Sequence, residues 1–178
     1  TTVVGRYKGR IVAWDVVNEA FEQSGELRDT VWLRVIGPEY IELAFRWAHE
    51  ADPEALLFYN DYSAETMNRK SNAVYALVQD LLEKGVPIHG VGFQMHIELG
   101  GAPSLRAVQR NMERLGALGL EVQITEMDVR LRDTKAQTLE RQAEIYGDTL
   151  QLCLDEPSCT AFVMWGFADC HSWIPSSF

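Results

Sequence analysis

Residues 11–19 read Ile-Val-Ala-Trp-Asp-Val-Val-Asn-Glu, a run rich in β-branched apolar residues that ends in a carboxylic acid. Residues 124–128, Ile-Thr-Glu-Met-Asp, repeat this arrangement much later in the chain. In a parallel α/β barrel the carboxyl ends of all strands open onto one face. We therefore expect Glu19 and Glu126 to converge at the ends of two strands, although they are far apart in sequence.

The rest of the chain alternates between strand-like and helix-like patterns. Short apolar runs predict strands, and amphipathic stretches bounded by Gly or Pro predict helices. Strands that alternate with helices of this length indicate βαβ units and a parallel sheet. The predicted strands are 11–17, 56–60, 91–96, 121–125 and 160–165, and the predicted helices are 38–51, 66–84, 104–118 and 136–154. A closed TIM (β/α)8 barrel has eight strands, so the expected fold is a partial barrel.

The composition sets limits on the class of protein. The chain has 178 residues, of which 47% are hydrophobic, enough for the core of one domain. A formal net charge of −10 argues against nucleic acid as a partner, because nucleic-acid affinity depends on Lys and Arg. No apolar run approaches the ~20 residues that span a bilayer, so no membrane partner is expected. Residues 1–6 lack the layout of a signal peptide, and any export signal is expected outside this chain.

A convergent carboxylate pair is what glycoside hydrolysis requires. One member protonates the departing sugar oxygen, and the other attacks the anomeric carbon or activates water. Either glutamate taken alone is more often a solvated loop residue or a helix cap. A metal site made of His96, Glu126 and Asp128 is disfavoured, because their spacing matches no familiar site and this hydrolysis needs no metal. We expect no cofactor.

Three further motifs join the two glutamate segments, namely residues 59–62 (Tyr-Asn-Asp-Tyr), 90–96 (Gly-Val-Gly-Phe-Gln-Met-His) and 165–167 (Trp-Gly-Phe). In order and spacing, the five motifs resemble the signatures of glycoside hydrolase family 10, the endo-β-1,4-xylanases, over essentially the whole chain. The resemblance implies a TIM barrel in which the predicted strands are strands four to eight. Residues 1–178 are then expected to be a partial catalytic domain that lacks strands one to three and the final helix.

The resemblance also implies roles for the two glutamates. Glu19 matches the general acid/base, and Asn18 matches the amide that binds the sugar 2-hydroxyl, a contact that strengthens in the transition state. Glu126 matches the nucleophile. A pair with a carboxyl separation of ~5 Å forms a covalent glycosyl-enzyme and retains the anomeric configuration.

Other site residues follow from the same resemblance. His96 matches a residue that contacts the nucleophile and is oriented by Asp128, and Gln94, two residues earlier in a strand, should face the same side. Tyr62 matches an aromatic residue on the leaving-group side. Trp165 and Trp173 match aromatic residues around the reacting sugar, whereas Trp14, Trp32 and Trp47 are expected to pack in the core. Ser63 and Cys170 depart from the family pattern, which commonly has Asn and a basic residue there.

The chain has three cysteines. Cys153 and Cys159 bracket a loop short enough for a local disulfide, and many family members carry a comparable pair. Such a bond implies an oxidising compartment, and Cys170 would remain a free thiol. Metal ligation by these cysteines is not expected, because no second Cys/His pair stands at zinc-site spacing.

Together these observations predict a retaining endo-β-1,4-xylanase that acts on xylan or xylo-oligosaccharides. The family implies that it is secreted and monomeric when complete. Three alternatives remain open: a cellulase-like retaining β-1,4-glycanase, a carbohydrate-binding protein without catalysis, and an inactive fragment with open sheet edges.

Overall fold

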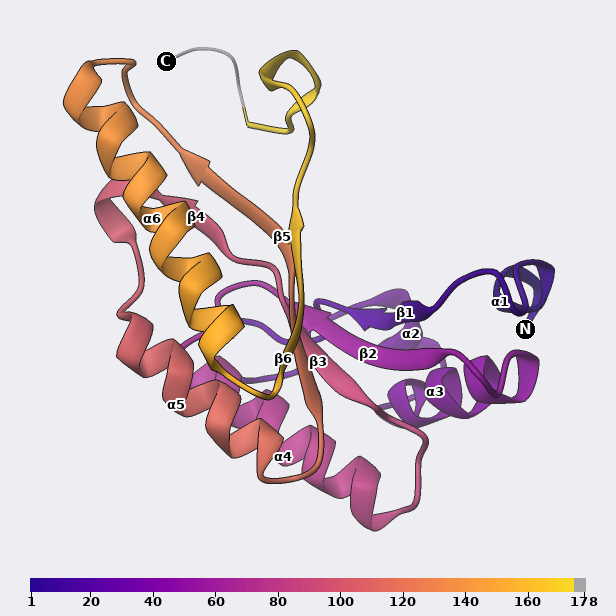
Figure 1. Ribbon diagram of the computed structural model, residues 1–178. Helices are drawn as coiled ribbons and strands as arrows, with labels where there is room; N and C mark the ends of the chain where they lie inside the picture. The colour runs from indigo at the N-terminus through magenta and orange to yellow at the C-terminus, as the bar shows by residue number, and fades with distance from the viewer. Residues whose placement is uncertain (175–178) are drawn as a thin grey trace.

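The computed structural model describes residues 1–174 and confirms a parallel α/β architecture (Figure 1). The strands are β1 (Ala13–Asn18), β2 (Leu56–Asp61), β3 (Gly90–Phe93), β4 (His96–Glu98), β5 (Glu121–Arg130) and β6 (Cys159–Met164). The helices are α1 (Thr2–Arg6), α2 (Val31–Val35), α3 (Tyr40–Ala51), α4 (Arg69–Glu83), α5 (Leu105–Gly116) and α6 (Ala136–Asp155), with short 3₁₀ turns at Leu99–Gly101 and Asp169–His171.

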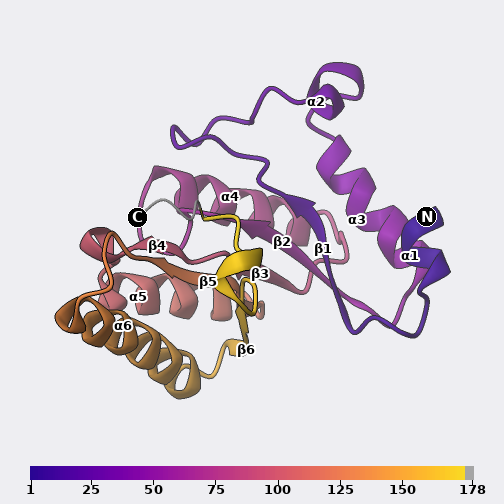
Figure 2. The same cartoon turned by 90° about the horizontal axis from the view of Figure 1, so that it is seen from above.

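All strand pairs in the sheet are parallel. The strands follow the order β1-β2-β3-β5, with β6 on the far side of β5 and β4 paired to the last part of β5. Seen from above, α4, α5 and α6 lie along one side of the curved sheet (Figure 2). This arrangement brings the carboxyl ends of the strands to one edge, as the βαβ pattern predicts.

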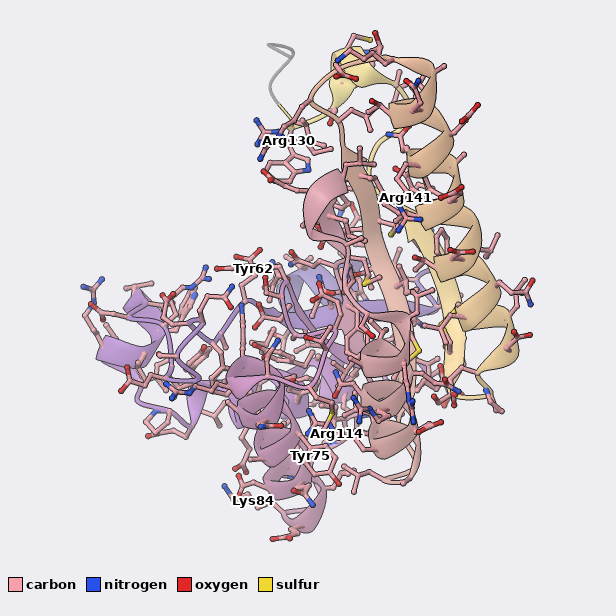
Figure 3. All side chains as sticks on the ribbon, turned by 90° about the vertical axis from the view of Figure 1, so that its left-hand side faces the viewer. Tyr62, Tyr75, Lys84, Arg114, Arg130 and Arg141 are labelled. Carbon is pink, nitrogen blue, oxygen red and sulfur yellow. A yellow bond between two sulfur atoms is a disulfide. The ribbon has the colours of Figure 1, made fainter. Side chains whose placement is uncertain are left out.

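Periodic apolar residues attach the helices to the sheet. Buried side chains recur every three or four residues along α3, α4 and α5, so each of these helices presents one apolar stripe to the core. These residues are Ile41, Phe45 and Ala48 in α3, Val74, Val78 and Leu81 in α4, and Val108, Met112 and Leu115 in α5. Figure 3 labels Tyr75 of α4 and Arg114 of α5, whose guanidinium carbon lies 4.7 Å from the Tyr75 ring centroid.

None of the helices in residues 1–174 is long and apolar enough to cross a membrane.

Most predicted boundaries differ from the structure by one or two residues, and three differ for a clear local physical reason. The predicted strand 91–96 is divided into β3 and β4, because the backbone turns at Met95, where φ is +61°. The predicted strand 121–125 continues to Arg130, because β4 pairs with its second half. The predicted helix 66–84 begins only at Arg69, because Asn68 accepts a hydrogen bond from the Ser71 amide and caps it.

The expectation that Trp32 and Trp47 pack in the core is wrong. Their exposed fractions are 59% and 47%, whereas Trp14 is half-buried against the core. Both exposed rings line a hollow of about 490 Å³ beside β1. Among the described residues β1 pairs only with β2, so this edge of the sheet offers nothing for the two rings to pack against.

The predicted cysteine pairing has a direct counterpart in the structure. A disulfide joins Cys153, near the end of α6, to Cys159, the first residue of β6. Cys170 is a free, exposed thiol. The bond therefore ties α6 to β6, the strand that follows it.

His89 makes the stability of the fold depend on pH. Its Nδ1 accepts a hydrogen bond of 2.9 Å from the Leu57 amide, and burial, with a smaller contribution from His49, lowers its pKa from the ordinary 6.5. The unfolded chain then binds more protons, so this contribution to stability is complete above about pH 6.5 and is lost as the pH falls through the folded pKa. His89→Asn keeps an acceptor for Leu57 but cannot titrate.

We expect urea unfolding to show a smaller loss of stability between pH 7 and pH 5 in His89→Asn than in the unaltered chain. The exposed His171 provides the matched control, and His171→Asn should leave the pH dependence unchanged. Equal pH dependence in the unaltered chain and His89→Asn would contradict this role of His89.

Candidate active site

A cleft of about 430 Å³ opens at the carboxyl ends of the strands. Its lining comes from segments far apart in sequence and includes most of the predicted site residues. The residues are Glu19, Tyr62, Ser63, Gln94, His96, Trp165 and Trp173. The parallel sheet thus collects these side chains at one edge, as strand-end placement predicts.

Glu19 directly follows β1 in an unusual backbone conformation. Its φ is +57°, a region that non-glycine residues rarely adopt, and its amide donates to the Asn60 carbonyl at 2.9 Å. Its Oε1 accepts from Gln94 Nε2 at 3.1 Å, and its Oε2 accepts from Arg28 Nη1 at 3.0 Å. Both carboxylate oxygens are therefore held by donors on other segments.

Glu126 lies inside β5 rather than after the strand, because β5 is longer than predicted. Its Oε1 accepts from Asn60 Nδ2 at 2.8 Å, and its Oε2 lies 3.2 Å from His96 Nε2. The carboxylate is mostly buried, with 13% of the side chain exposed. Contacts from β2 and β4 thus fix the direction in which Glu126 points.

Asn60, at the end of β2, lies between the two glutamates. Besides Glu126, its Nδ2 reaches Asn18 Oδ1 at 3.0 Å, and its Oδ1 accepts from Thr125 Oγ1 at 2.7 Å. Gln94 Nε2 also donates to Asn18 Oδ1, at 3.1 Å. A continuous hydrogen-bonded chain therefore runs from Glu19 through the three amides to Glu126. Within residues 1–174 the Asn18 amide nitrogen has no acceptor, so it is available to a ligand.

A glycine makes room for this chain. Gly92 of β3 lies between Asn60 and Thr125, where a Cβ atom would collide with Asn60 Oδ1. Any larger residue at this position would push the Asn60 amide out of the line that joins Asn18 to Glu126.

His96 connects Glu126 to a second carboxylate. Its Nδ1 lies 3.0 Å from Asp128 Oδ1, and Asp128 Oδ2 accepts from Trp173 Nε1 at 2.7 Å. Burial lowers the pKa of His96, but the hydrogen bond and charge of Asp128 and the charge of Glu126 outweigh it, so the pKa is raised. In its protonated form His96 donates to both carboxylates and thereby holds Glu126 and Asp128 in place.

Asp15 adds a third carboxylate near Glu126. Partial burial, and then the negative charge of Glu126, raise its pKa to about 6. Much of the Asp15 side chain is still open to solvent, which moderates this effect. Asp15 therefore gains or loses its proton near pH 6.

The cleft wall beside Glu19 is formed by Tyr62. Its hydroxyl accepts from Arg28 Nη2 at 2.8 Å, and the same guanidinium binds Glu19. In the same lining, Trp173 and Trp165 stand edge-on to the His96 ring, with centroids 5.0 and 6.4 Å away. The cleft thus offers one aromatic side chain beside Glu19 and two beside His96.

Sequence reasoning located most of these residues but missed two. The structure brings together Asn18, Glu19, Tyr62, Gln94, His96, Glu126, Asp128, Trp165 and Trp173. It adds Asn60 and Arg28. The strand-end rule could have found Asn60, whereas Arg28 lies in an irregular segment without a periodic signal.

Residues 1–174 contain no group of three or more His, Cys, Asp or Glu side chains arranged to hold a metal ion.

A parallel α/β sheet with two braced glutamates and aromatic walls at its strand ends defines a domain of the glycoside hydrolase class. Comparison with known proteins is more specific: the sequence profile of glycosyl hydrolase family 10 matches residues 1–178. The chain belongs to this family. The predicted family and the partial TIM-barrel fold are thereby confirmed.

Several relatives are closely similar. Endo-1,4-beta-xylanase B of Thermotoga neapolitana is 50% identical, over 99% of this chain and 51% of its own length. Xylanase 10B of Thermotoga petrophila, solved in complex with xylobiose, is 52% identical with a TM-score of 0.94, over 99% of this chain and 54% of that chain. Exoglucanase XynX of Acetivibrio thermocellus is 41% identical over 98% of this chain and 17% of its own length. The chain thus spans about half the length of the Thermotoga relatives.

Proposed function

We propose that this chain carries the reacting centre of a retaining endo-β-1,4-xylanase. The observation that supports this most strongly is the hydrogen-bonded chain that joins Glu19, in the lining of the cleft, to Glu126. Xylan and xylo-oligosaccharides are the proposed substrates, because the relatives named above include an endo-xylanase and a xylanase solved with xylobiose. Residues 1–178 would form part of a catalytic domain whose remaining strands complete the barrel.

In this proposal Glu126 is the nucleophile. His96 and Asn60 keep its carboxylate ionised and aimed, so an oxygen attacks the anomeric carbon and forms a covalent glycosyl-enzyme. Glu19 gives its proton to the glycosidic oxygen as that bond breaks. Glu19 then takes a proton from water, which attacks the intermediate and releases a sugar of retained configuration.

Four polar or aromatic side chains would bind the sugar. The free Asn18 amide nitrogen would donate to the 2-hydroxyl beside the reacting carbon, where the contact strengthens in the transition state. Tyr62 stands on the Glu19 side, and protonation of the leaving oxygen by Glu19 puts the leaving sugar on that side. Trp165 and Trp173 would then flank the sugar that Glu126 attacks.

The experiment is proton NMR of xylo-oligosaccharide hydrolysis at high enzyme concentration. We expect the first new reducing ends to be β-anomers, because two successive inversions retain the configuration. First-formed α-anomers would contradict the retaining mechanism. The cellulase-like alternative would be favoured if reducing ends were released faster from cellulose than from xylan. We test this alternative because the chain is also similar to Exoglucanase XynX.

We further propose that the protein acts outside the cell. The disulfide between Cys153 and Cys159 supports this, because such bonds persist in oxidising compartments.

A further inference from the structure

Lys70 is fully buried although it carries an ammonium group. It is the second residue of α4, where the positive end of the helix dipole makes a cation unfavourable. Burial of an ammonium group in a protein interior is costly unless it is paired. Lys70 is unfavourable both as a cation at the start of a helix and as a charge in the core, so we expect it to have a functional role.

The partner of Lys70 is the equally buried Asp61 at the end of β2. Lys70 Nζ lies 2.6 Å from Asp61 Oδ1, and both side chains are 0% exposed. Lys70 Nζ also lies 3.5 Å from the centroid of the Tyr62 ring, which is a close cation–π contact. The ion pair therefore lies directly beneath the aromatic wall of the cleft.

Asp61 extends the network toward Glu19. Its Oδ1 accepts from the Tyr62 amide at 2.9 Å, and its Oδ2 accepts from the Tyr59 hydroxyl at 2.5 Å. The Tyr59 hydroxyl in turn accepts from the Ala20 amide at 3.0 Å. Burial and the charge of Asp61 raise the pKa of Tyr59, so its proton stays in place. The network thus ends at the residue that follows Glu19.

Tyr62 is held from two directions. Lys70 lies against its ring, and Arg28 binds its hydroxyl and the Glu19 carboxylate. Figure 3 labels Tyr62 at the loop end of the strands, far from Lys84 at the other end of α4. The same Arg28 guanidinium therefore holds both the Tyr62 hydroxyl and the Glu19 carboxylate.

From this geometry we infer that Lys70 and Asp61 form a positioning pair for the leaving-group half of the site. The pair sets the Tyr62 ring as the platform for the leaving sugar and holds the left-handed turn that presents the Glu19 carboxyl. This role rests on the function proposed above. Neither residue touches the substrate, and both act through Tyr62, Tyr59 and the Ala20 amide.

The test replaces the pair by neutral side chains of similar size. Removal of one partner leaves a buried charge and endangers folding, whereas removal of both charges is commonly tolerated. The variant is therefore Asp61→Asn/Lys70→Met. The Tyr62 amide and the Tyr59 hydroxyl donate to different oxygens of Asp61. Asparagine replaces one of these oxygens by an NH2 group, which cannot accept, so one of the two hydrogen bonds is lost at that position. Leu115→Ala, in the core contact of α5, is the control for general loss of stability.

The first readout is amide hydrogen exchange in the 178-residue chain, which requires no activity. We expect exchange of the Ala20 amide, the Tyr62 amide or both to become about tenfold faster in the double variant, since each is protected by this network. Amides of the β3 strand should keep their protection. In Leu115→Ala, the Ala20 and Tyr62 amides should change no more than other core amides.

The second readout compares kcat/KM for two substrates that differ in their leaving group. In the double variant, kcat/KM for xylotetraose should fall about tenfold, because this substrate needs both Tyr62 and the Glu19 proton. With an aryl xylobioside that has a good leaving group, kcat/KM should stay within about threefold. Unchanged exchange overturns the inference, and so does faster exchange with unchanged xylotetraose kinetics. If neither the unaltered chain nor the same chain joined to the N-terminal segment of a family relative hydrolyses these substrates, the proposed function has failed, and the exchange measurement alone decides the positioning network.

Discussion

Glu126→Ala should abolish hydrolysis of both xylan and activated aryl xylosides, lowering kcat/KM by about 10⁴-fold or more. Every substrate must form the bond to Glu126, so a good leaving group cannot compensate for its loss. Glu19→Ala should behave differently. It should lower kcat/KM for xylan by about 10²–10⁴-fold but that for an activated aryl substrate by less than about tenfold, because such a leaving group departs without a proton.

Transient kinetics gives a second signature of these roles. Glu19 also activates water in the second step, so Glu19→Ala should release a burst of phenol and accumulate the glycosyl-enzyme. Glu121→Ala, at the opposite end of β5 from the cleft, is the matched control and should retain normal kinetics. Equal losses on both substrate types for Glu19→Ala and Glu126→Ala would refute the assigned roles.

The second large effect concerns the open edge of the sheet. The 178-residue chain should be at least about a hundredfold less active on xylan than the same chain joined to the N-terminal segment of a family relative, because ~1 Å of misplacement already costs that much. Glu19 follows β1, which pairs only with β2 among the described residues, and Trp32 and Trp47 are exposed beside it. A neighbouring strand would cover this edge and fix Glu19.

The comparison requires equal concentrations of folded protein and measures reducing sugar released from xylan. As a control, the joined protein with Glu126→Ala should be inactive, which shows that the added segment supplies no activity of its own. Activity of the short chain within about tenfold of the joined protein would contradict the prediction. Analytical ultracentrifugation would then show whether two copies complete each other's site.

The exposure of Trp32 and Trp47 shows where local patterns fail. Trp47 lies in the predicted helix 38–51 and Trp32 in the connection before it, and both are large apolar residues that were expected to pack in the core. Burial depends on what covers a surface, and no strand in the described residues lies beyond β1. The same limit applies to β5, whose length depends on β4 as a partner.

The sequence by itself determined the parallel α/β class, the position of Glu19 at a strand end, the pairing of Glu19 with Glu126 in one site, and most of the residues that line the cleft. These follow from alternation and from short motifs, which neighbouring residues along the chain encode. Only the tertiary structure decided that Asn60 joins the two glutamates, that Arg28 binds both Glu19 and Tyr62, and that Lys70 lies buried beneath the Tyr62 ring. Some of these contacts join segments far apart in sequence, and the others join a strand end to a nearby loop or helix; in every case the geometry arises only when the strands and helices pack together.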